Sequence, residues 1–150
     1  MKVSQLLAER SGPVLSTEPD TTIHDVAKTL RERKIGLLVV CGTRGEFVGV
    51  ISERDIIRGL AEVGADVIST KVSSLMTKDV LTCTPDDDTS AVLRRLWINN
   101  IRHMTVVRED LLVGILSVRD LLKSITEEGG TRAREILLDV LREGRYYPGA

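Results

Sequence analysis

The fold is decided by Gly49-Val50-Ile51-Ser52-Glu53-Arg54-Asp55, which returns almost unchanged as Gly114-Ile115-Leu116-Ser117-Val118-Arg119-Asp120. Each copy reads as the end of an apolar strand that runs into a helix, with Ser at the first cap and Asp three residues later. Two copies of one strand-to-helix junction predict a repeated fold.

The Ser-x-x-Asp spacing has two interpretations. A strand-to-helix junction directs backbone N–H groups and the positive end of a helix dipole at whatever lies above it, which favours an anion site. The same spacing approximates a capping box, which satisfies the first N–H groups of a helix and does nothing else. Local sequence leaves both interpretations open.

The composition is that of an ordinary globular protein. At 150 residues, with 42% hydrophobic and 29% charged residues, the chain suits one domain or two small halves that share a core. The apolar runs have strand length and no signal segment begins the chain, so we expect a cytoplasmic protein. Cys41 and Cys83 stand alone and are predicted to be buried reduced thiols.

Several functions are disfavoured by the same composition. The net charge is −1 and the aromatic residues are one Trp, two Tyr and one Phe, which argues against nucleic-acid binding. Common nucleotide-hydrolysing, dinucleotide-binding, zinc-protease and serine-hydrolase motifs are missing, which argues against an enzyme. The sequence contains no metal-ligand cluster, and His24 is expected to be solvated on the outer face of a helix.

The repeat extends through most of the chain. A short amphipathic segment from Val3 precedes a strand, a helix, two strands and a helix, and the same order starts again at Val72. Pro19 corresponds to Pro85 at an offset of 85 − 19 = 66 residues, and Asp55 to Asp120 at 120 − 55 = 65. The second hairpin turn is therefore one residue shorter, as expected for a structural repeat with length changes in its turns.

Helical spacing predicts which helix faces are buried. The first long helix is expected to bury Ile23, Val26, Ala27 and Leu30, and the helix after Ser52 to bury Ile56, Ile57, Leu60 and Ala61. The run 35–41 is apolar throughout and predicts a strand covered on both faces. A last amphipathic helix is predicted over 131–143, with a loose tail after it.

These residues resemble a tandem pair of CBS domains, the arrangement often called a Bateman module. The resemblance rests on Ile35-Gly36-Leu37-Leu38-Val39-Val40 with the first junction, and on Ile101-Arg102-His103-Met104-Thr105-Val106-Val107 with the second. It implies an α/β (α+β) fold of two β-α-β-β-α repeats with pseudo-twofold symmetry, at residues 3–64 and 72–126, plus a C-terminal helix and tail at 131–150. Thr105 stands where many members of the family have Pro.

The resemblance also implies two ligand clefts, each with an Asp for the ribose hydroxyls, a Ser and an Arg near ribose or phosphate, and mid-strand and opposite-repeat residues around adenine. The first cleft would comprise Ile35, Gly36, Leu37, Val50, Ser52, Arg54, Asp55, Val80 and Leu81. The second would comprise Val14, Leu15, Ile101, Arg102, His103, Ile115, Ser117, Arg119 and Asp120. Arg102 and His103 add cationic or donor groups, so we expect the second cleft to hold phosphate better.

The expected function is a non-enzymatic regulatory sensor that binds AMP, ADP, ATP or NAD(H), needs no catalytic cofactor and signals by conformational change to a downstream protein that the sequence does not name. The alternative is a ligand-independent assembly protein in which both Ser-x-x-Asp motifs only cap helices. Amphipathic junction helices on a small module also predict a homodimer. No nucleic acid or membrane partner is expected.

Overall fold

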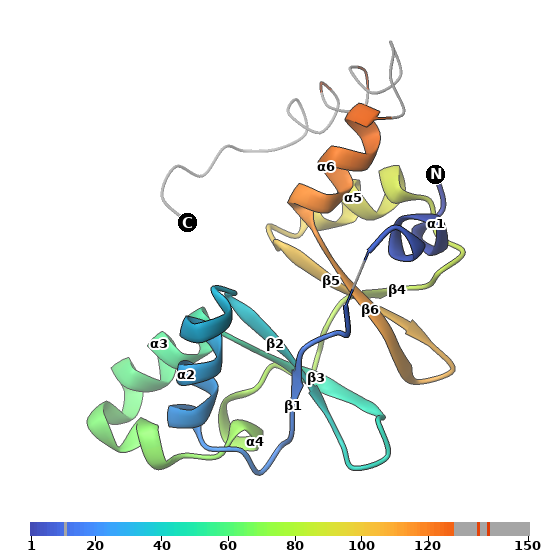
Figure 1. Ribbon diagram of the computed structural model, residues 1–150. Helices are drawn as coiled ribbons and strands as arrows, with labels where there is room; N and C mark the ends of the chain where they lie inside the picture. Colours follow the sequence, from blue (N-terminus) through green and yellow to red (C-terminus); the bar gives the residue numbers. More distant parts are fainter. Residues whose placement is uncertain (11, 128–134, 136–137, 139–150) are drawn as a thin grey trace. The chain divides into compact units, whose positions relative to one another are not determined.

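The computed structural model describes residues 1–10, 12–127, 135 and 138 (Figure 1). The predicted helix at 131–143 and the tail after it lie outside the described residues, apart from two isolated positions. The elements, in chain order, are α1 (Val3–Ala8), β1 (Ser16–Thr17), α2 (Ile23–Arg33), β2 (Leu37–Cys41), β3 (Phe47–Ser52), α3 (Glu53–Val63), the 3-10 helix η1 (Gly64–Ser69), α4 (Val72–Leu75), β4 (Thr82–Cys83), α5 (Thr89–Ile98), β5 (His103–Arg108), β6 (Leu111–Ser117) and α6 (Val118–Glu127).

The strands form two three-stranded sheets of the same topology, β1-β2-β3 and β4-β5-β6. In the first sheet β1 runs parallel to β2, and β2 pairs antiparallel with β3. The parallel pairing of β4 with β5 repeats this arrangement. The predicted α/β class and the predicted order of elements in both repeats are confirmed.

The helix after the first strand of each repeat ends in the same way. Lys34 follows α2 with a φ of 54°, and Asn100 follows α5 with a φ of 52°. In both cases the next residue donates its N–H five residues back, Ile35 to Leu30 and Ile101 to Leu96. These left-handed residues satisfy the last helix carbonyls and turn the chain into the central strand.

The compact units of the chain do not coincide with the sequence repeats. One unit, here called the Asp55 unit, comprises Pro13–Leu81 and Glu109–Leu112. The other, the Asp120 unit, comprises Met1–Gly12, Thr82–Arg108 and the described residues from Val113. Each sequence repeat thus gives its first short helix to the unit built on the other repeat.

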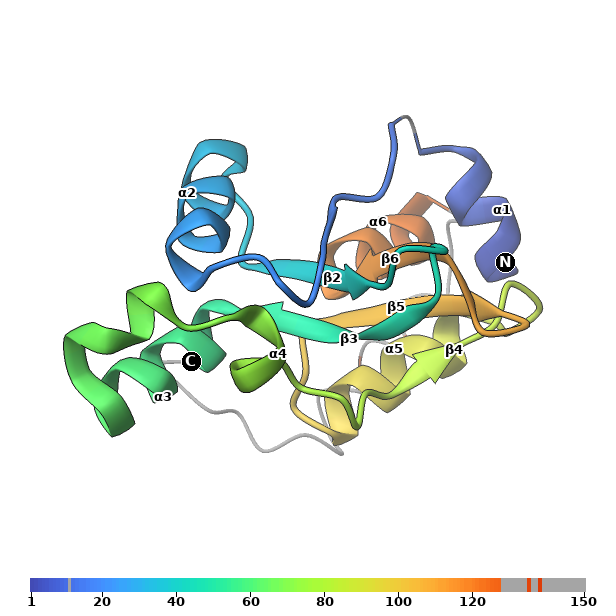
Figure 2. The same cartoon turned by 90° about the horizontal axis from the view of Figure 1, so that it is seen from below.

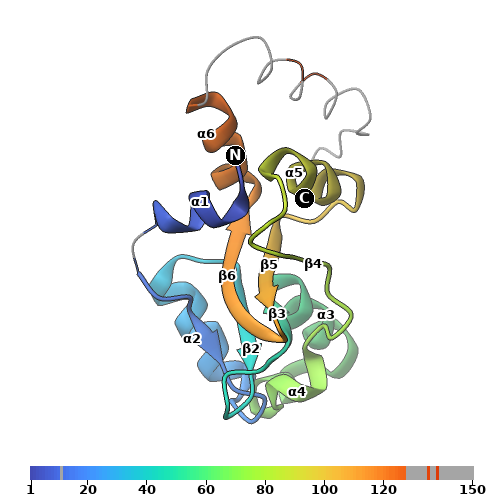
Figure 3. The ribbon, with the colours of Figure 1, turned by 90° about the vertical axis from the view of Figure 1, so that its right-hand side faces the viewer.

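Each unit has its own hydrophobic core. In the Asp120 unit, Val3 and Leu6 of α1 are buried with side chains of α5, α6 and the β4–β6 sheet, and Figure 3 shows α1 beside β6. In the Asp55 unit, Val72 of α4 is buried with side chains of α2, β2 and β3. Figure 2 shows β3 leading directly into α3 of that unit. The first short helix is therefore a core element of the unit it joins.

The predicted inner face of α3 is wrong for three of its four residues, since only Ile56 packs against the core. Ile57 and Leu60 are 65% and 52% exposed, and Ala61 is exposed as well, whereas Asp55 and Gly59 are buried. A Cβ at Gly59 would lie 2.8 Å from the methyl groups of Leu75, so the helix packs closely through its glycine. Apolar spacing identified a stripe on α3 but not the face that is buried.

Smaller differences concern α2 and the cysteines. Ala27 is exposed, while Ile23, Val26 and Leu30 are buried as predicted. Cys83 is buried, and burial together with the nearby Asp87 raises its pKa to about 11, against an opposing effect of Arg95. Cys41 is only partly buried. Both thiols are free. Because the raised pKa keeps the buried Cys83 thiol protonated at neutral pH, we regard Cys83 as a core residue rather than a reactive thiol.

Candidate functional site

Both Ser-x-x-Asp junctions form the predicted cap. Ser52 has extended backbone angles, and its Oγ accepts the N–H of Asp55 at 3.3 Å while its own N–H donates to Asp55 Oδ2 at 2.9 Å. The second junction repeats both bonds, from Asp120 N–H to Ser117 Oγ at 3.2 Å and from Ser117 N–H to Asp120 Oδ2 at 2.7 Å. The serine hydroxyls also donate to the same Oδ2 atoms. One oxygen of each carboxylate is thus committed to its helix.

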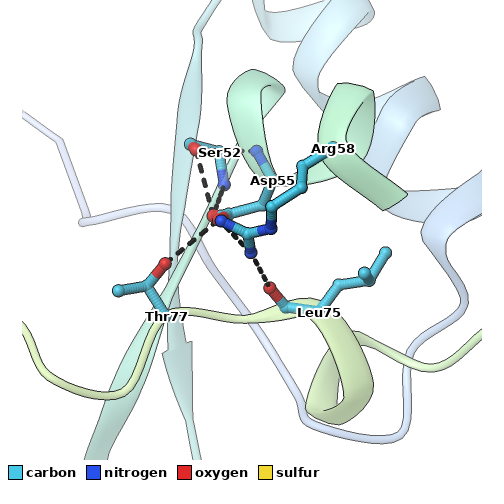
Figure 4. Close-up of polar contacts among 5 residues, drawn as sticks. All are labelled: Ser52, Asp55, Arg58, Leu75 and Thr77. Carbon is cyan, nitrogen blue, oxygen red and sulfur yellow. Dashed lines mark hydrogen bonds and ion pairs between the residues drawn. The ribbon is translucent and has the colours of Figure 1, made fainter. Parts of the chain in front are cut away.

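The second oxygen of Asp55 is also occupied (Figure 4). Thr77 Oγ1 and Arg58 Nη2 each donate to Asp55 Oδ1 at 3.0 Å, and the Asp55 side chain is only 4% exposed. Thr77 is fixed in turn by backbone bonds in both directions with Val50, at 2.8 and 3.0 Å. The Asp55 carboxylate is therefore enclosed by groups of its own unit.

Asp120 has a different surrounding. Arg10, which follows α1, places Nη2 2.5 Å from Asp120 Oδ2, and its Nη1 donates to the carbonyl of Ile115. Among the described residues Asp120 Oδ1 has no hydrogen-bond or ion-pair partner, and the side chain is 20% exposed. This carboxylate keeps one oxygen for a further donor.

The electrostatics of the Asp120 unit suit an anionic carboxylate. Burial acts to raise the pKa of Asp120, but hydrogen bonds from Ser117 and the charge of Arg10 outweigh it, so the pKa is lowered. Desolvation lowers the pKa of His103, and the charges of Arg102 and Arg10 add to this effect while Asp120 opposes it. Asp120 is therefore ionised, and His103 is neutral, at neutral pH.

The mid-strand residues of both predicted clefts lie at these junctions. The carbonyl of Gly36 accepts the N–H of Glu53 at 3.0 Å, and the carbonyl of Arg102 accepts the N–H of Val118 at the same distance. A Cβ at Gly36 would meet Glu53 Oε2 at 3.2 Å, so the glycine permits this approach. Leu37 is the register partner of Ser52. Strand and helix start are thus joined identically in the two repeats.

Other predicted site residues are not brought to the aspartates by any described contact. Val80 and Leu81 belong to the same unit as Asp55 and precede β4, with Leu81 exposed. Val14 and Leu15 belong to the Asp55 unit, so their position near Asp120 stays a prediction. Ile35 and Ile101 pack against the cores of their own units. Arg54 and Arg119 are exposed and make no ion pair with another described residue.

The partners of the carboxylates were missed from the sequence. Arg58 lies three residues after Asp55, a spacing that favours a helical ion pair and could have indicated it. Thr77 and Arg10 come from the segments beyond α4 and α1, and no local signal links them to the aspartates. Only the exchange of the first short helices between units brings them there.

The described residues restrict other kinds of site. Within them, no group of three or more His, Cys, Asp or Glu side chains could hold a metal ion. The helices of this part of the chain are too short or too polar to cross a bilayer.

The repeat, the two sheets and the paired junctions define a tandem module, and the family model for the CBS domain matches it at residues 3–62 and 72–127. The chain belongs to the CBS-domain family.

Three comparisons place it among known proteins. An uncharacterised 17.7 kDa protein of Acidianus ambivalens is 33% identical over 140 residues, which cover 90% of this chain and 82% of that protein. The crystal structure of a CBS-domain protein from Agrobacterium tumefaciens is 32% identical with a TM-score of 0.76, covering 83% of this chain and 98% of that one. A CBS-domain protein from Pyrobaculum aerophilum, solved in complex with AMP, is 29% identical with a TM-score of 0.72, covering 95% and 99%.

Proposed function

We propose that the chain is a non-enzymatic regulatory module that binds an adenosine-containing nucleotide at its Ser-x-x-Asp junctions. The observation that carries the proposal is the Asp120 carboxylate, which is ionised, partly exposed and unpartnered at Oδ1 among the described residues, with the Arg10 guanidinium beside it. A carboxylate accepts hydrogen bonds from ribose hydroxyls, and a guanidinium fork suits phosphate oxygens. The AMP complex of the Pyrobaculum aerophilum relative supports the same ligand class.

Adenine recognition would use the remaining predicted residues. The mid-strand backbone around Gly36 and Arg102 already lies at the helix starts. The opposite-repeat residues Val80, Leu81, Val14 and Leu15 are the further residues that would take part in adenine recognition. AMP, ADP, ATP and NAD(H) share the adenosine moiety that this arrangement would read.

Signalling requires two states of the module with different affinity for the nucleotide, because a ligand shifts an equilibrium only by that difference. The readout would be a contact with a downstream protein. The module would act in the cytoplasm, a setting to which its two free thiols are suited.

A second copy of the chain is the proposed assembly partner. Ile57, Leu60 and Val63 on α3, together with Ile68 on η1, are 52–65% exposed. Large exposed apolar side chains on neighbouring elements typically mark an interaction surface. A homodimer through this surface would bury them.

The testing experiment is thermal unfolding of purified protein, stripped of carried-over ligand, against AMP, ADP, ATP, NAD⁺, NADH and, as controls, guanine nucleotides. A ligand at about 100 times its dissociation constant adds about 2.7 kcal/mol of stability. For a chain of this length that raises Tm by roughly 5–11 °C. A rise with adenine nucleotides alone supports the proposal, and a flat panel contradicts it.

The competing function is a ligand-independent assembly protein, favoured by the complete capping boxes at both junctions. In that case Asp120→Asn would change only stability, by about 1 kcal/mol. Loss of the nucleotide response with the fold retained would exclude it.

A further inference from the structure

The two junctions share a sequence motif, but their carboxylates are not equally available. We propose that the chain binds one nucleotide, at Asp120, and that Asp55 is a closed structural cap whose carboxylate takes no ligand. This inference rests on the proposed function and deepens it, because it assigns the ligand to one of the two predicted sites.

The Asp55 carboxylate is saturated by four hydrogen bonds from its own unit: Ser52 N–H and Oγ on Oδ2, and Thr77 Oγ1 and Arg58 Nη2 on Oδ1. A carboxylate offers about four lone-pair sites. A ribose diol could bind only by displacing Thr77 and Arg58, and a buried polar group that loses its partner is costly.

The backbone of Thr77 is fixed against β3. Its backbone pairs with Val50 through two hydrogen bonds, and its carbonyl oxygen lies so close to β3 that a Cβ at Gly49 would approach it to 2.5 Å. Arg58 is held a second time by the carbonyl of Leu75 at 3.3 Å. Opening Asp55 would therefore deprive the Thr77 hydroxyl and the Arg58 guanidinium of the carboxylate oxygen that both now bind.

The equivalent position in the Asp120 unit is filled by a side chain rather than by backbone. A Cβ at Gly114 would meet Cδ2 of the Leu7 side chain at 2.7 Å, where Gly49 has a backbone carbonyl. The partner of Asp120 is the Arg10 side chain, which binds Oδ2 of the carboxylate and the carbonyl of Ile115 and leaves Oδ1 without a partner among the described residues. A ribose hydroxyl could reach Oδ1 while Arg10 keeps its ion pair or turns to a phosphate.

The experiment is isothermal titration calorimetry of the full-length chain, freed of carried-over ligand, with AMP and, separately, with NAD⁺. We expect about one nucleotide per chain for the ligand that binds. Two nucleotides per chain would overturn this inference and leave the proposed function standing, whereas no binding of either would overturn both. The stoichiometry of the unaltered chain decides how many nucleotides bind, and substitutions then decide which junction holds the nucleotide.

Matched substitutions assign the site. Asp120→Asn should weaken binding by about ten-fold or more, the effect of losing a charge-assisted hydrogen bond. Asp55→Asn should leave the dissociation constant within about two-fold while lowering Tm. If Asp55→Asn abolishes binding in a folded protein and Asp120→Asn does not, the assignment is wrong.

Discussion

The two glycines that begin the junctions provide a direct test of the closed Asp55 site. Gly49 and Gly114 are equivalent in the repeat, and both are buried. An added Cβ would meet a fixed backbone oxygen of Thr77 at 2.5 Å in one case and a side-chain methyl of Leu7 at 2.7 Å in the other. The same substitution should therefore have different consequences in the two repeats.

Gly49→Ala must separate the Thr77 segment from β3. The change endangers two backbone hydrogen bonds with Val50 and the hydroxyl bond to Asp55, each worth about 1 kcal/mol net. We expect a loss of about 2–4 kcal/mol in the free energy of unfolding. At about 2–4 °C per kcal/mol for a chain of this size, Tm falls by about 4–16 °C.

Gly114→Ala is the matched control. Leu7 is partly buried and packs at the edge of its core, so its side chain can change rotamer to admit a methyl group. The cost of repacking is offset by about 0.4–1 kcal/mol from the stiffer unfolded chain. We expect a stability within about 1 kcal/mol of the unaltered protein.

Urea and thermal unfolding followed by circular dichroism would measure both variants. The double variant Gly49→Ala, Asp55→Asn should lose less than the sum of the single changes, since both remove the Thr77 bond, with a coupling of about 0.5–3 kcal/mol. Equal destabilisation by the two alanines, or strict additivity in the double variant, would refute the argument that Thr77 locks Asp55.

Three further predictions concern other side chains. Arg10→Met should cost about 1 kcal/mol at low salt and less at high salt, because its ion pair with Asp120 is partly exposed, and it should weaken binding of AMP more than binding of adenosine in parallel titrations. The folded-state pKa of His103 lies below its usual value, because burial disfavours the charged imidazolium. The stabilisation from neutral His103 is therefore present above about pH 6.5 and is lost as pH falls through the lowered folded-state pKa, so His103→Gln should flatten the urea stability profile between about pH 7 and 5. Leu60→Ser, on the exposed apolar face of α3, should weaken self-association measured by sedimentation at micromolar concentration without lowering the Tm of the monomer. A dimer of unchanged affinity would show that the interface does not include this face.

Much of the fold could be read from short-range patterns. The hairpins and the serine caps depend on neighbours within a few positions, and the repeat doubles each signal. The inner face of α3 could not be read in this way. The apolar side chains Ile57, Leu60 and Val63 of α3 are exposed instead of buried in their own unit. The helix packs closely against Leu75 through Gly59, a residue that hydrophobic spacing does not detect.

The candidate site shows where local sequence stops being informative. Ser-x-x-Asp specifies the cap, because both partners lie within one turn of helix, and the two caps are accordingly alike. The other partners of the two carboxylates are distant in sequence: Thr77, 22 residues from Asp55, donates to Asp55 Oδ1, and Arg10, near the start of the chain, pairs with Asp120 Oδ2. These contacts exist only because α1 and α4 each pack in the unit that is built on the other repeat. One motif can therefore serve a closed cap and an open acceptor in the same chain, and the difference lies in what the exchanged segments place against it.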